Sequence, residues 1–317
     1  MNVVLDILHL LTTSGLWQTA LQDSILLLLP ALGGVISERS GVVNIAMEGM
    51  MLTGAFTAVV CDLAWHNPWL ATLTAILAGG LMASLHAVVS IHFHADQIIS
   101  GIAINVFAAG LTTFLVNQLT NNQGGTDHVR SAYRLPVVNI PLLDKLPFVG
   151  TVFFQQNIVV YVALLLLVGI HFMLFRTRLG LRIRAVGEHP QAADTAGINV
   201  FRLRYGAVIA SGLLSGLAGA FLSIGVLNVF NPNMTNGRGY IALAAMIFGK
   251  WTPFGAFVAC LIFGVGNAIY DFNSTIRISP YLLNTLPYLL TLLVLAGLVG
   301  KSLPPAADGV PYEPGSE

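Results

Sequence analysis

Charged side chains are scarce in this sequence. The 14 Lys and Arg and the 14 Asp and Glu residues make up 9% of the 317 residues, whereas soluble domains carry about 25%. Because 56% of the residues are hydrophobic, the composition excludes an ordinary soluble domain and predicts an integral membrane protein within a lipid bilayer. The formal net charge is zero, so nothing indicates a nucleic-acid partner.

Cysteine is also nearly absent, and no catalytic constellation is legible. Cys61 and Cys260 both fall in apolar runs, which is more typical of small buried side chains than of a disulfide or a metal site. Gly300-Lys-Ser302 ends like a phosphate-binding loop, but residue 295 is Leu and not the first glycine that such a loop requires. The sequence therefore predicts no catalytic residue, no metal site and no cofactor in this chain.

Neither end of the chain is expected to lie within the membrane domain. No Lys or Arg precedes Arg39, so residues 1–16 lack the cationic region of a secretory signal and are expected to form a leader. Residues 302–317 are rich in Pro, Ala and Gly and are expected to form a disordered tail. The transmembrane domain is therefore expected over residues 17–301.

Apolar runs define the predicted fold. A helix that crosses a bilayer needs about 20 predominantly apolar residues, and six runs supply them: Trp17–Ile36, Val42–Cys61, Trp69–Ile91, Ile98–Leu119, Ile158–Phe175 and Tyr205–Val229. In the C-terminal third, Tyr240–Phe248 is too short to cross comfortably, Phe254–Tyr270 is marginal and Leu282–Val299 is adequate. Short runs of this kind are typical of broken or re-entrant helices. The prediction is an all-α polytopic membrane protein with about 8–10 transmembrane or partly spanning helices.

The segment 176–204 contains six of the 14 Lys and Arg residues and lies between two apolar runs. Short cationic loops resist transfer across a bilayer, so this loop is expected in the cytoplasm. Pro190 suits the start of a short helix and Gly197 its end, and Ala192, Ala193 and Ala196 would give that helix a small, smooth face. Either the helix is held by packing against a partner protein, or the loop is a solvated connector that only orients the chain.

The segment 120–157 is then external. It is long, and it contains Asn121-Asn-Gln-Gly-Gly125 and three prolines. Long loops without regular structure are usually functional or disordered. Docking of an external partner and a passive linker both remain open for this segment.

Polar side chains inside the apolar runs are candidates for a pathway. Glu48 is placed about two turns into its run, where an acidic side chain costs about 2 to 3 kcal/mol at mid-membrane. Asn44 lies four residues earlier and is expected on the same helix face. The pair either lines a pathway or forms an interhelical hydrogen bond. Asn105, Asn228 and Asn267 are further intramembrane amides, which can bind a neutral polar solute or hold helices together.

Three segments carry a resemblance to a known family. They are residues 31–49, with Ser-Glu-Arg-Ser-Gly-Val-Val-Asn-Ile followed by Glu-Gly-Met-Met, residues 184–197, with Arg-Ala-Val-Gly-Glu-His-Pro-Gln-Ala-Ala-Asp-Thr-Ala-Gly, and residues 237–251. These segments resemble bacterial ABC-importer permeases of the ribose and branched-chain amino acid superfamily. Within it, the first segment is most similar to the smaller permease of nucleoside importers.

The resemblance implies a pore-forming subunit in the bacterial cytoplasmic membrane. Such a subunit pairs with a second permease and with a cytoplasmic ABC ATPase that binds the ATP, and an external substrate-binding lipoprotein delivers the substrate. A short cytoplasmic helix docks on the ATPase in these importers. Carried over to this sequence, the coupling residues are Arg182, Arg184, Gly187, Glu188, Pro190, Ala192, Ala193 and Gly197. Some relatives begin with an additional helix, which the short leader here lacks.

The substrate implied by the resemblance is a nucleoside, with a simple sugar as the alternative. A rival of another class is an ion-coupled secondary transporter that uses Glu48 as a proton site. A membrane enzyme is disfavoured, because no combination of acid, base and nucleophile can be assembled.

Overall fold

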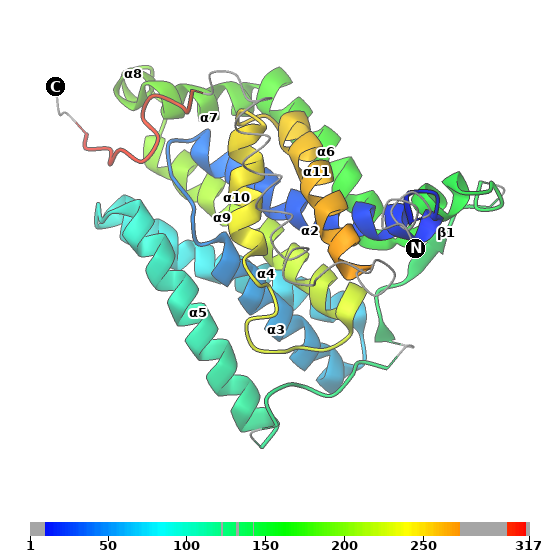
Figure 1. Ribbon diagram of the computed structural model, residues 1–317. Coiled ribbons are helices and arrows are strands. Elements are labelled where there is room, and N and C mark those ends of the chain that lie inside the picture. Colours follow the sequence, from blue (N-terminus) through cyan, green and yellow to red (C-terminus); the bar gives the residue numbers. More distant parts are fainter. Residues whose placement is uncertain (1–9, 122, 131–132, 142, 273–302, 315–317) are drawn as a thin grey trace.

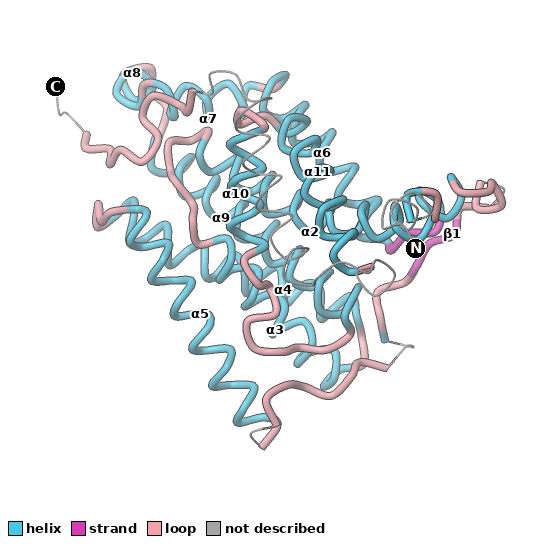
Figure 2. Tube along the Cα trace, in the orientation of Figure 1, coloured by secondary structure: helices cyan, strands magenta, loops and turns pink. Residues whose placement is uncertain are grey.

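The computed structural model describes residues 10–121, 123–130, 133–141, 143–272 and 303–314. Nearly all of its regular structure is helical (Figure 2). Within these residues, seven helices are long and apolar enough to span a membrane: α2 (Ser14–Glu38), α3 (Met47–Trp65), α4 with η1 (Pro68–Ala87 and Val88–His92), α5 (Gln97–Leu119), α6 (Ile158–Arg176), α9 with η4 (Val200–Ala220 and Phe221–Leu227) and α11 (Pro253–Asp271). The shorter helices are α7 (Arg178–Glu188), α8 (Pro190–Thr195) and α10 (Arg238–Phe248).

These helices confirm the predicted all-α, multi-pass membrane fold. The seven spans and the short apolar helix α10 make eight elements in the described part of the chain, at the lower end of the predicted range. The run predicted at Leu282–Val299 lies outside the described residues. The first span begins at Ser14, within the segment that was expected to be a leader.

The central helix of the bundle is α2 (Figure 1). From Asp23 to Glu38 every one of its residues is buried, as expected of a helix that is apolar all round. It packs against α9, α10 and α11. The core of the domain is therefore organised along this helix.

Small residues allow α4 and α9 to approach closely. A Cβ atom added at Gly79 of α4 would lie 2.8 Å from Gly216 Cα, and one at Gly212 would meet the backbone of Gly79. Membrane helices lack a hydrophobic force that drives them together, so close backbone contact supplies much of their packing energy. The Gly-x-x-x-Gly pair at residues 212 and 216 is therefore a packing motif.

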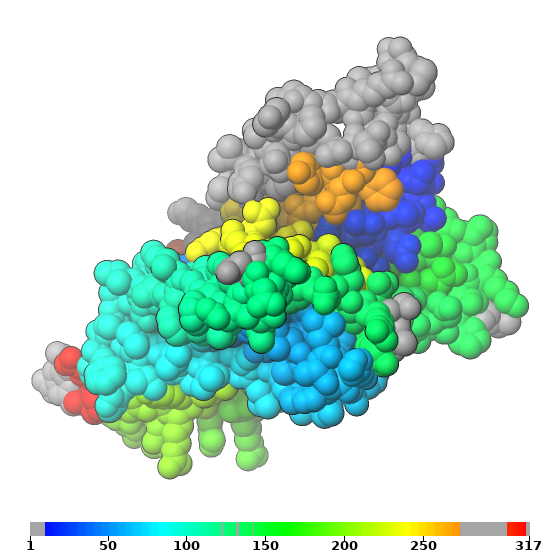
Figure 3. All heavy atoms as spheres, turned by 90° about the horizontal axis from the view of Figure 1, so that it is seen from below, coloured from blue at the N-terminus to red at the C-terminus, as the bar shows by residue number. Residues whose placement is uncertain are grey.

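Large apolar side chains remain exposed on the outer helices. Leu73, Leu77 and Leu81 form such a row on α4, and α5 and α6 expose Val106 and Leu165 in the same way. Such surface suits contact with lipid or with another membrane subunit. Figure 3 shows α4 and α5 (cyan to green) on one side of the molecule, α11 (orange) on the other, and α10 (yellow) between them.

Residues 120–157, which are expected to be external, contain two short strands in their described part. Strands β1 (Val137–Asn139) and β2 (Gln155–Asn157) pair antiparallel, with Val137 opposite Asn157, and the π-helical turn η3 (Gly150–Phe154) precedes β2. Residues 126–130 are hydrogen-bonded to the segment after α9, from Val129 N to Asn228 O (2.8 Å) and from Thr126 N to Phe230 O (3.0 Å). These residues are thereby fixed to the helix bundle.

The tail differs from the expected disorder. Among residues 303–314, Ala307 and Tyr312 are buried, and the backbone N–H of Ala307 donates to Gly187 O at 2.9 Å. The tail lies beside α7 and α8 at one end of the molecule (Figure 1). Composition predicted disorder because it does not show that Tyr312 can be buried against residues elsewhere in the chain.

Candidate functional site

Glu48 lies at a junction between two helices. The prediction that it sits two turns into a helix is wrong, because α3 begins at Met47 and Glu48 is in the first turn. Its side chain is 6% exposed. The carboxylate accepts hydrogen bonds from the backbone N–H groups of Gly237 (2.8 Å) and Gly239 (2.6 Å), at the start of α10.

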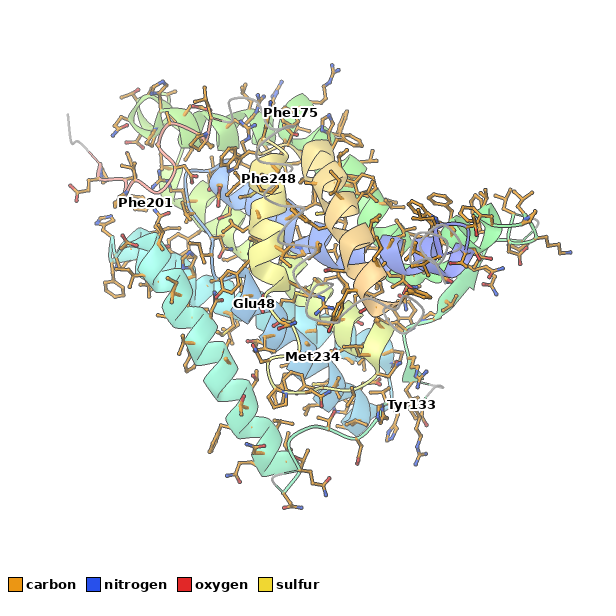
Figure 4. The ribbon with its side chains drawn as sticks, in the orientation of Figure 1. Glu48, Tyr133, Phe175, Phe201, Met234 and Phe248 are labelled. Atoms are coloured by element: carbon orange, nitrogen blue, oxygen red, sulfur yellow. The ribbon has the colours of Figure 1, made fainter. Side chains whose placement is uncertain are left out.

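This arrangement has a simple electrostatic cause. The first N–H groups of a helix have no partner within the helix, and the helix dipole places partial positive charge there. A carboxylate at that position satisfies two donors at once and is stabilised by the dipole. Glu48 thus holds the N-terminal end of α10 against α3. Figure 4 shows Glu48 at this junction.

A cavity of about 370 Å³ opens beside this junction. Its walls come from α3, α5, the loop before α10 and α10 itself, and its lining consists of Glu48, Gly49, Leu52, Asn105, Val106, Ala109, Asn233, Asn236, Gly237 and Tyr240. The volume lies within the range of small-molecule sites, which is roughly 300 to 1,000 Å³. Amides, a phenol and a carboxylate converge in it with few other polar groups.

Asn105 connects three walls of the cavity. Its amide nitrogen donates to Ile45 O (2.9 Å) and to the Tyr240 hydroxyl (2.9 Å), and its amide oxygen accepts from Gly49 N (2.7 Å). The buried amide therefore fixes α5 against the start of α3 and against α10. Of the five predicted pathway residues, the structure brings Glu48 and Asn105 together in one cavity.

The other three predicted pathway residues lie elsewhere. Asn44 is in a non-helical segment and donates to Ser211 Oγ (2.9 Å), so it does not share a helix face with Glu48. Asn228 closes η4 in a left-handed conformation, φ 59°. Asn267 is half-buried in α11. None of the three lines the cavity beside Glu48.

Sequence reasoning missed three polar side chains of this cavity, namely Asn233, Asn236 and Tyr240. Both asparagines have positive φ angles of 58° and 45°, a conformation that asparagine tolerates better than most residues. The cluster Asn231-Pro-Asn-Met-Thr-Asn-Gly237 before a short apolar run was the available signal. It predicts a turn, and a turn at a broken helix is where a pathway is expected.

The short helix predicted between Pro190 and Gly197 is present as α8. Pro190 is at its first position, and Gly197 follows its end with a φ of 80°. Ala193 is 4% exposed and packs with Val186, Val200 and Tyr312. The predicted face of small residues is therefore divided: Ala193 faces this chain's own core, whereas Ala192 and Ala196 are exposed.

The remaining predicted coupling residues occupy different environments. Arg182 is exposed, and the guanidinium of Arg184 lies 5.2 Å from the centre of the Phe175 ring. Gly187 is buried, and a Cβ there would collide with the backbone of Arg39. The Glu188 carboxylate accepts from the backbone N–H of Ala306 at 3.2 Å. Gly187 and Glu188 therefore contact this chain's own tail and its Arg39 turn.

The tail is attached to the bundle through Asp308 and its neighbours. Arg204, 1% exposed at the start of α9, donates to Val310 O at 3.0 Å. The Tyr312 ring lies 5.5 Å from that of Phe201. Burial raises the pKa of the Asp308 carboxyl from 3.8 to about 7, although a hydrogen bond with Glu38 and the charge of Arg204 act in the opposite direction. Asp308 and Glu38 are in contact, so the two carboxyls titrate together.

Tail attachment is therefore expected to weaken as the pH rises. Above pH 4 the detached tail ionises at Asp308 while the attached tail keeps its proton up to about pH 7, so the attached state loses relative stability between these values and levels off above 7. Hydrogen exchange of residues 303–314, corrected for intrinsic rates, should show protection falling roughly fiftyfold from pH 5 to pH 7. Asp308→Asn should remove most of this dependence, and an equal dependence in both proteins would contradict the assignment.

Comparison with known proteins places the chain among transport proteins. Residues 17–295 match the family described as branched-chain amino acid transport system/permease component. A guanosine ABC transporter permease protein of Bacillus subtilis (NupQ) is 43% identical, and a nucleoside ABC transporter permease protein of Lactococcus lactis (NupC) is 40% identical. Both alignments cover 90% of this chain and 92% of the relative. A putative glucose ABC transporter permease protein of Haloferax volcanii (TsgC13) is 36% identical, over 89% of this chain and 91% of the relative.

No solved structure matches the chain. The family match nevertheless covers α2 from Trp17 onward, the other six described spans and α10, and it includes both the Glu48 junction and residues 176–204. The resemblance inferred from residues 31–49, 184–197 and 237–251 is thereby confirmed. This chain belongs to the permease component family of branched-chain amino acid transport systems and is the membrane-spanning permease subunit of an ABC importer.

Proposed function

We propose that this permease conducts nucleosides, with the cavity at Glu48 as part of the pathway. The observation that carries the proposal is the identity of 43% and 40% to permeases named for guanosine and for nucleosides, each over 90% of the chain. A simple sugar is the second candidate, because the relative named for glucose is 36% identical. Both candidates are neutral polar solutes.

The chemistry of the cavity supports a neutral polar substrate. Asn105, Asn233, Asn236 and Tyr240 present amide and hydroxyl groups, which donate and accept hydrogen bonds. Both oxygens of Glu48 are already engaged by backbone N–H groups. A solute therefore meets mainly the amides of Asn233 and Asn236 and the phenol of Tyr240 in a volume of about 370 Å³.

The proposed partner on the cytoplasmic side is an ABC ATPase, which binds and hydrolyses the ATP. Gln191, Ala192, Thr195 and Ala196 are exposed on or directly after α8, and α8 itself is held in place from within by Ala193. A short helix packed from one side and small on the other suits a groove in a partner. A second permease would complete the pathway.

The proposed external partner is a substrate-binding lipoprotein. A second cavity, of about 320 Å³, lies at the outer end of α3 and is lined by Asp62, Leu63, His66, Asp127, His128, Val129, Arg130 and Tyr133. Acidic and basic side chains rim this cavity, and charges of both signs favour orientation of a docking protein. The hydrogen-bonded position of residues 126–130 supports docking over a passive linker.

The substrate assignment is tested with the receptor and the assembled importer. The cognate external receptor should bind guanosine in calorimetry, and proteoliposomes that contain the importer should accumulate it only when ATP is supplied. Tight binding of glucose or an amino acid with none of nucleosides would overturn the substrate. Uptake that persists without ATP and stops with an uncoupler would instead favour an ion-coupled transporter.

A further inference from the structure

The short helix α10 is held at both of its ends by acidic side chains from other helices. At its N-terminal end, Gly237 and Gly239 donate to the Glu48 carboxylate. Beyond its C-terminal end, the indole N–H of Trp251 donates to the carboxylate of Glu38, the last residue of α2. Figure 4 shows Glu48 and Phe248 near opposite ends of this helix.

The inner end forms a clamp of three side chains, Glu38, Arg39 and Trp251. Besides the indole bond to Glu38, the guanidinium of Arg39 donates through Nε to Trp251 O at 2.9 Å. Trp251 is 5% exposed. Its φ of 51° is uncommon for a bulky residue and persists only where surrounding contacts determine it. The clamp therefore fixes the inner end of α10 in one position.

The clamp is continuous with the cytoplasmic loop. Gly187, the penultimate residue of α7, packs against the Arg39 backbone so closely that a Cβ would collide with it. Gly187 O accepts from Ala307 N (2.9 Å), and the next residue, Asp308, is hydrogen-bonded to Glu38. A displacement of α7 and α8 must therefore displace Arg39 and Glu38.

At the other end, α10 cannot move without disturbing Glu48. A Cβ added at Gly239 would lie 2.6 Å from Glu48 Cα and would also crowd the Glu48 carboxylate. Packed helices shift as units, because their interfaces have discrete arrangements and do not deform continuously. The 11 residues of α10 span ~16 Å, which separates the clamp from the cavity.

We propose that α10 is a rigid link that carries movement of the cytoplasmic loop to Glu48, and that Trp251 is the positioning residue at its inner end. The inference rests on the proposed function, because it assumes that an ATPase moves the loop and that the Glu48 cavity is part of the pathway. When the loop moves outward, the clamp shifts the inner end of α10. The N–H groups at its other end then release or re-engage Glu48, which changes the wall of the cavity.

Spatial continuity alone does not establish coupling, so the test is a double-mutant cycle. The assembled importer in proteoliposomes is compared with Trp251→Phe, Glu48→Gln and the double variant, and guanosine transported per ATP hydrolysed is measured. Each single change should lower this ratio about tenfold. Independent sites more than about 10 Å apart combine additively in free energy, which would give about a hundredfold loss in the double variant. If α10 is a rigid link, the double variant should transport guanosine per ATP hydrolysed within about twofold of the more impaired single variant.

Trp69→Phe is the matched control. It makes the same replacement at an exposed tryptophan of α4, away from α10, so the ratio should stay within about twofold of the unchanged protein. If Trp251→Phe does not give monodisperse protein, Arg39→Lys is tested in its place. This change keeps the positive charge at residue 39 but removes the guanidinium that can bond to two backbone carbonyls, at residues 250 and 251. A hundredfold loss in the double variant, or full coupling in Trp251→Phe, would overturn the proposal.

A second readout does not depend on the substrate. Hydrogen exchange of a peptide covering residues 236–241 reports the N–H groups that donate to Glu48. Trp251→Phe should speed their exchange at least fivefold, whereas Trp69→Phe should leave it unchanged. If the importer carries no nucleoside but Trp251→Phe still speeds this exchange, the substrate assignment is wrong and the role of α10 as a rigid link stands. Unchanged exchange in Trp251→Phe would contradict the link itself.

Discussion

Replacing Ala192 with arginine is expected to abolish ATP-driven uptake while the membrane domain still inserts and folds. Ala192 is exposed on α8, so the larger side chain meets no group of this chain but would prevent close contact with the proposed ATPase. Uptake by proteoliposomes should fall at least a hundredfold, and the ATPase should no longer co-purify with the permease.

Two comparisons make this result specific. His94→Arg adds the same side chain at the exposed turn between η1 and α5 and should transport normally. Ala193→Arg should instead impair folding, because Ala193 is buried against Val186, Val200 and Tyr312. Normal co-purification of the ATPase with Ala192→Arg would show that α8 is not the docking helix.

Replacing Glu48 with alanine is expected to cause the second large loss. The change leaves the N–H groups of Gly237 and Gly239 without their acceptor in a buried position, and bonds of this charge-assisted kind contribute about 1.5 to 3 kcal/mol each. Thermal stability should decrease, and guanosine uptake should fall more than tenfold because the N-terminal end of α10 is no longer fixed.

The comparison for Glu48→Ala is Asp127→Asn, which removes an acidic group from the exposed external segment. It should keep the melting temperature, since Asp127 lies outside the bundle. If Glu48→Ala melts and transports like the unchanged protein, the two backbone bonds do not hold α10, and the assignment of the cavity fails with them.

The sequence predicted helices well where a long apolar run determines them. It predicted them less well where side chains far along the chain form hydrogen bonds with the backbone. Residues 42–46 are as apolar as the membrane-spanning helices, yet they are not helical. Their backbone bonds to residues far along the chain: Val43 N donates to Gln97 Oε1 (2.7 Å), and Ile45 O accepts from Asn105 (2.9 Å). No local pattern reveals such partners, so the start of α3 and the position of Glu48 in it were missed.

The polar sites show the same limit. Glu48 and Asn105 were identifiable because a charge or an amide inside an apolar run needs a reason. Trp251 was not, since an aromatic residue after an apolar run usually marks the membrane interface. Its bond to Glu38 joins residues 213 positions apart. Similarly, Pro190 and Gly197 predicted the bounds of α8, but which of its alanines faces outward depends on Tyr312 in the tail.

The length of α10 has a consequence for where the solute rests. A helix of 11 residues rises ~16 Å, about half of the ~30 Å hydrocarbon thickness of a bilayer. Its C-terminal end is tied to the turn at Arg39, so the Asn233–Asn236 loop and the cavity lie about half a hydrocarbon thickness from that turn along the helix. A solute in the cavity then has only this short distance to cover on the Arg39 side, and its exposure to that side requires a thin gate and no long translocation.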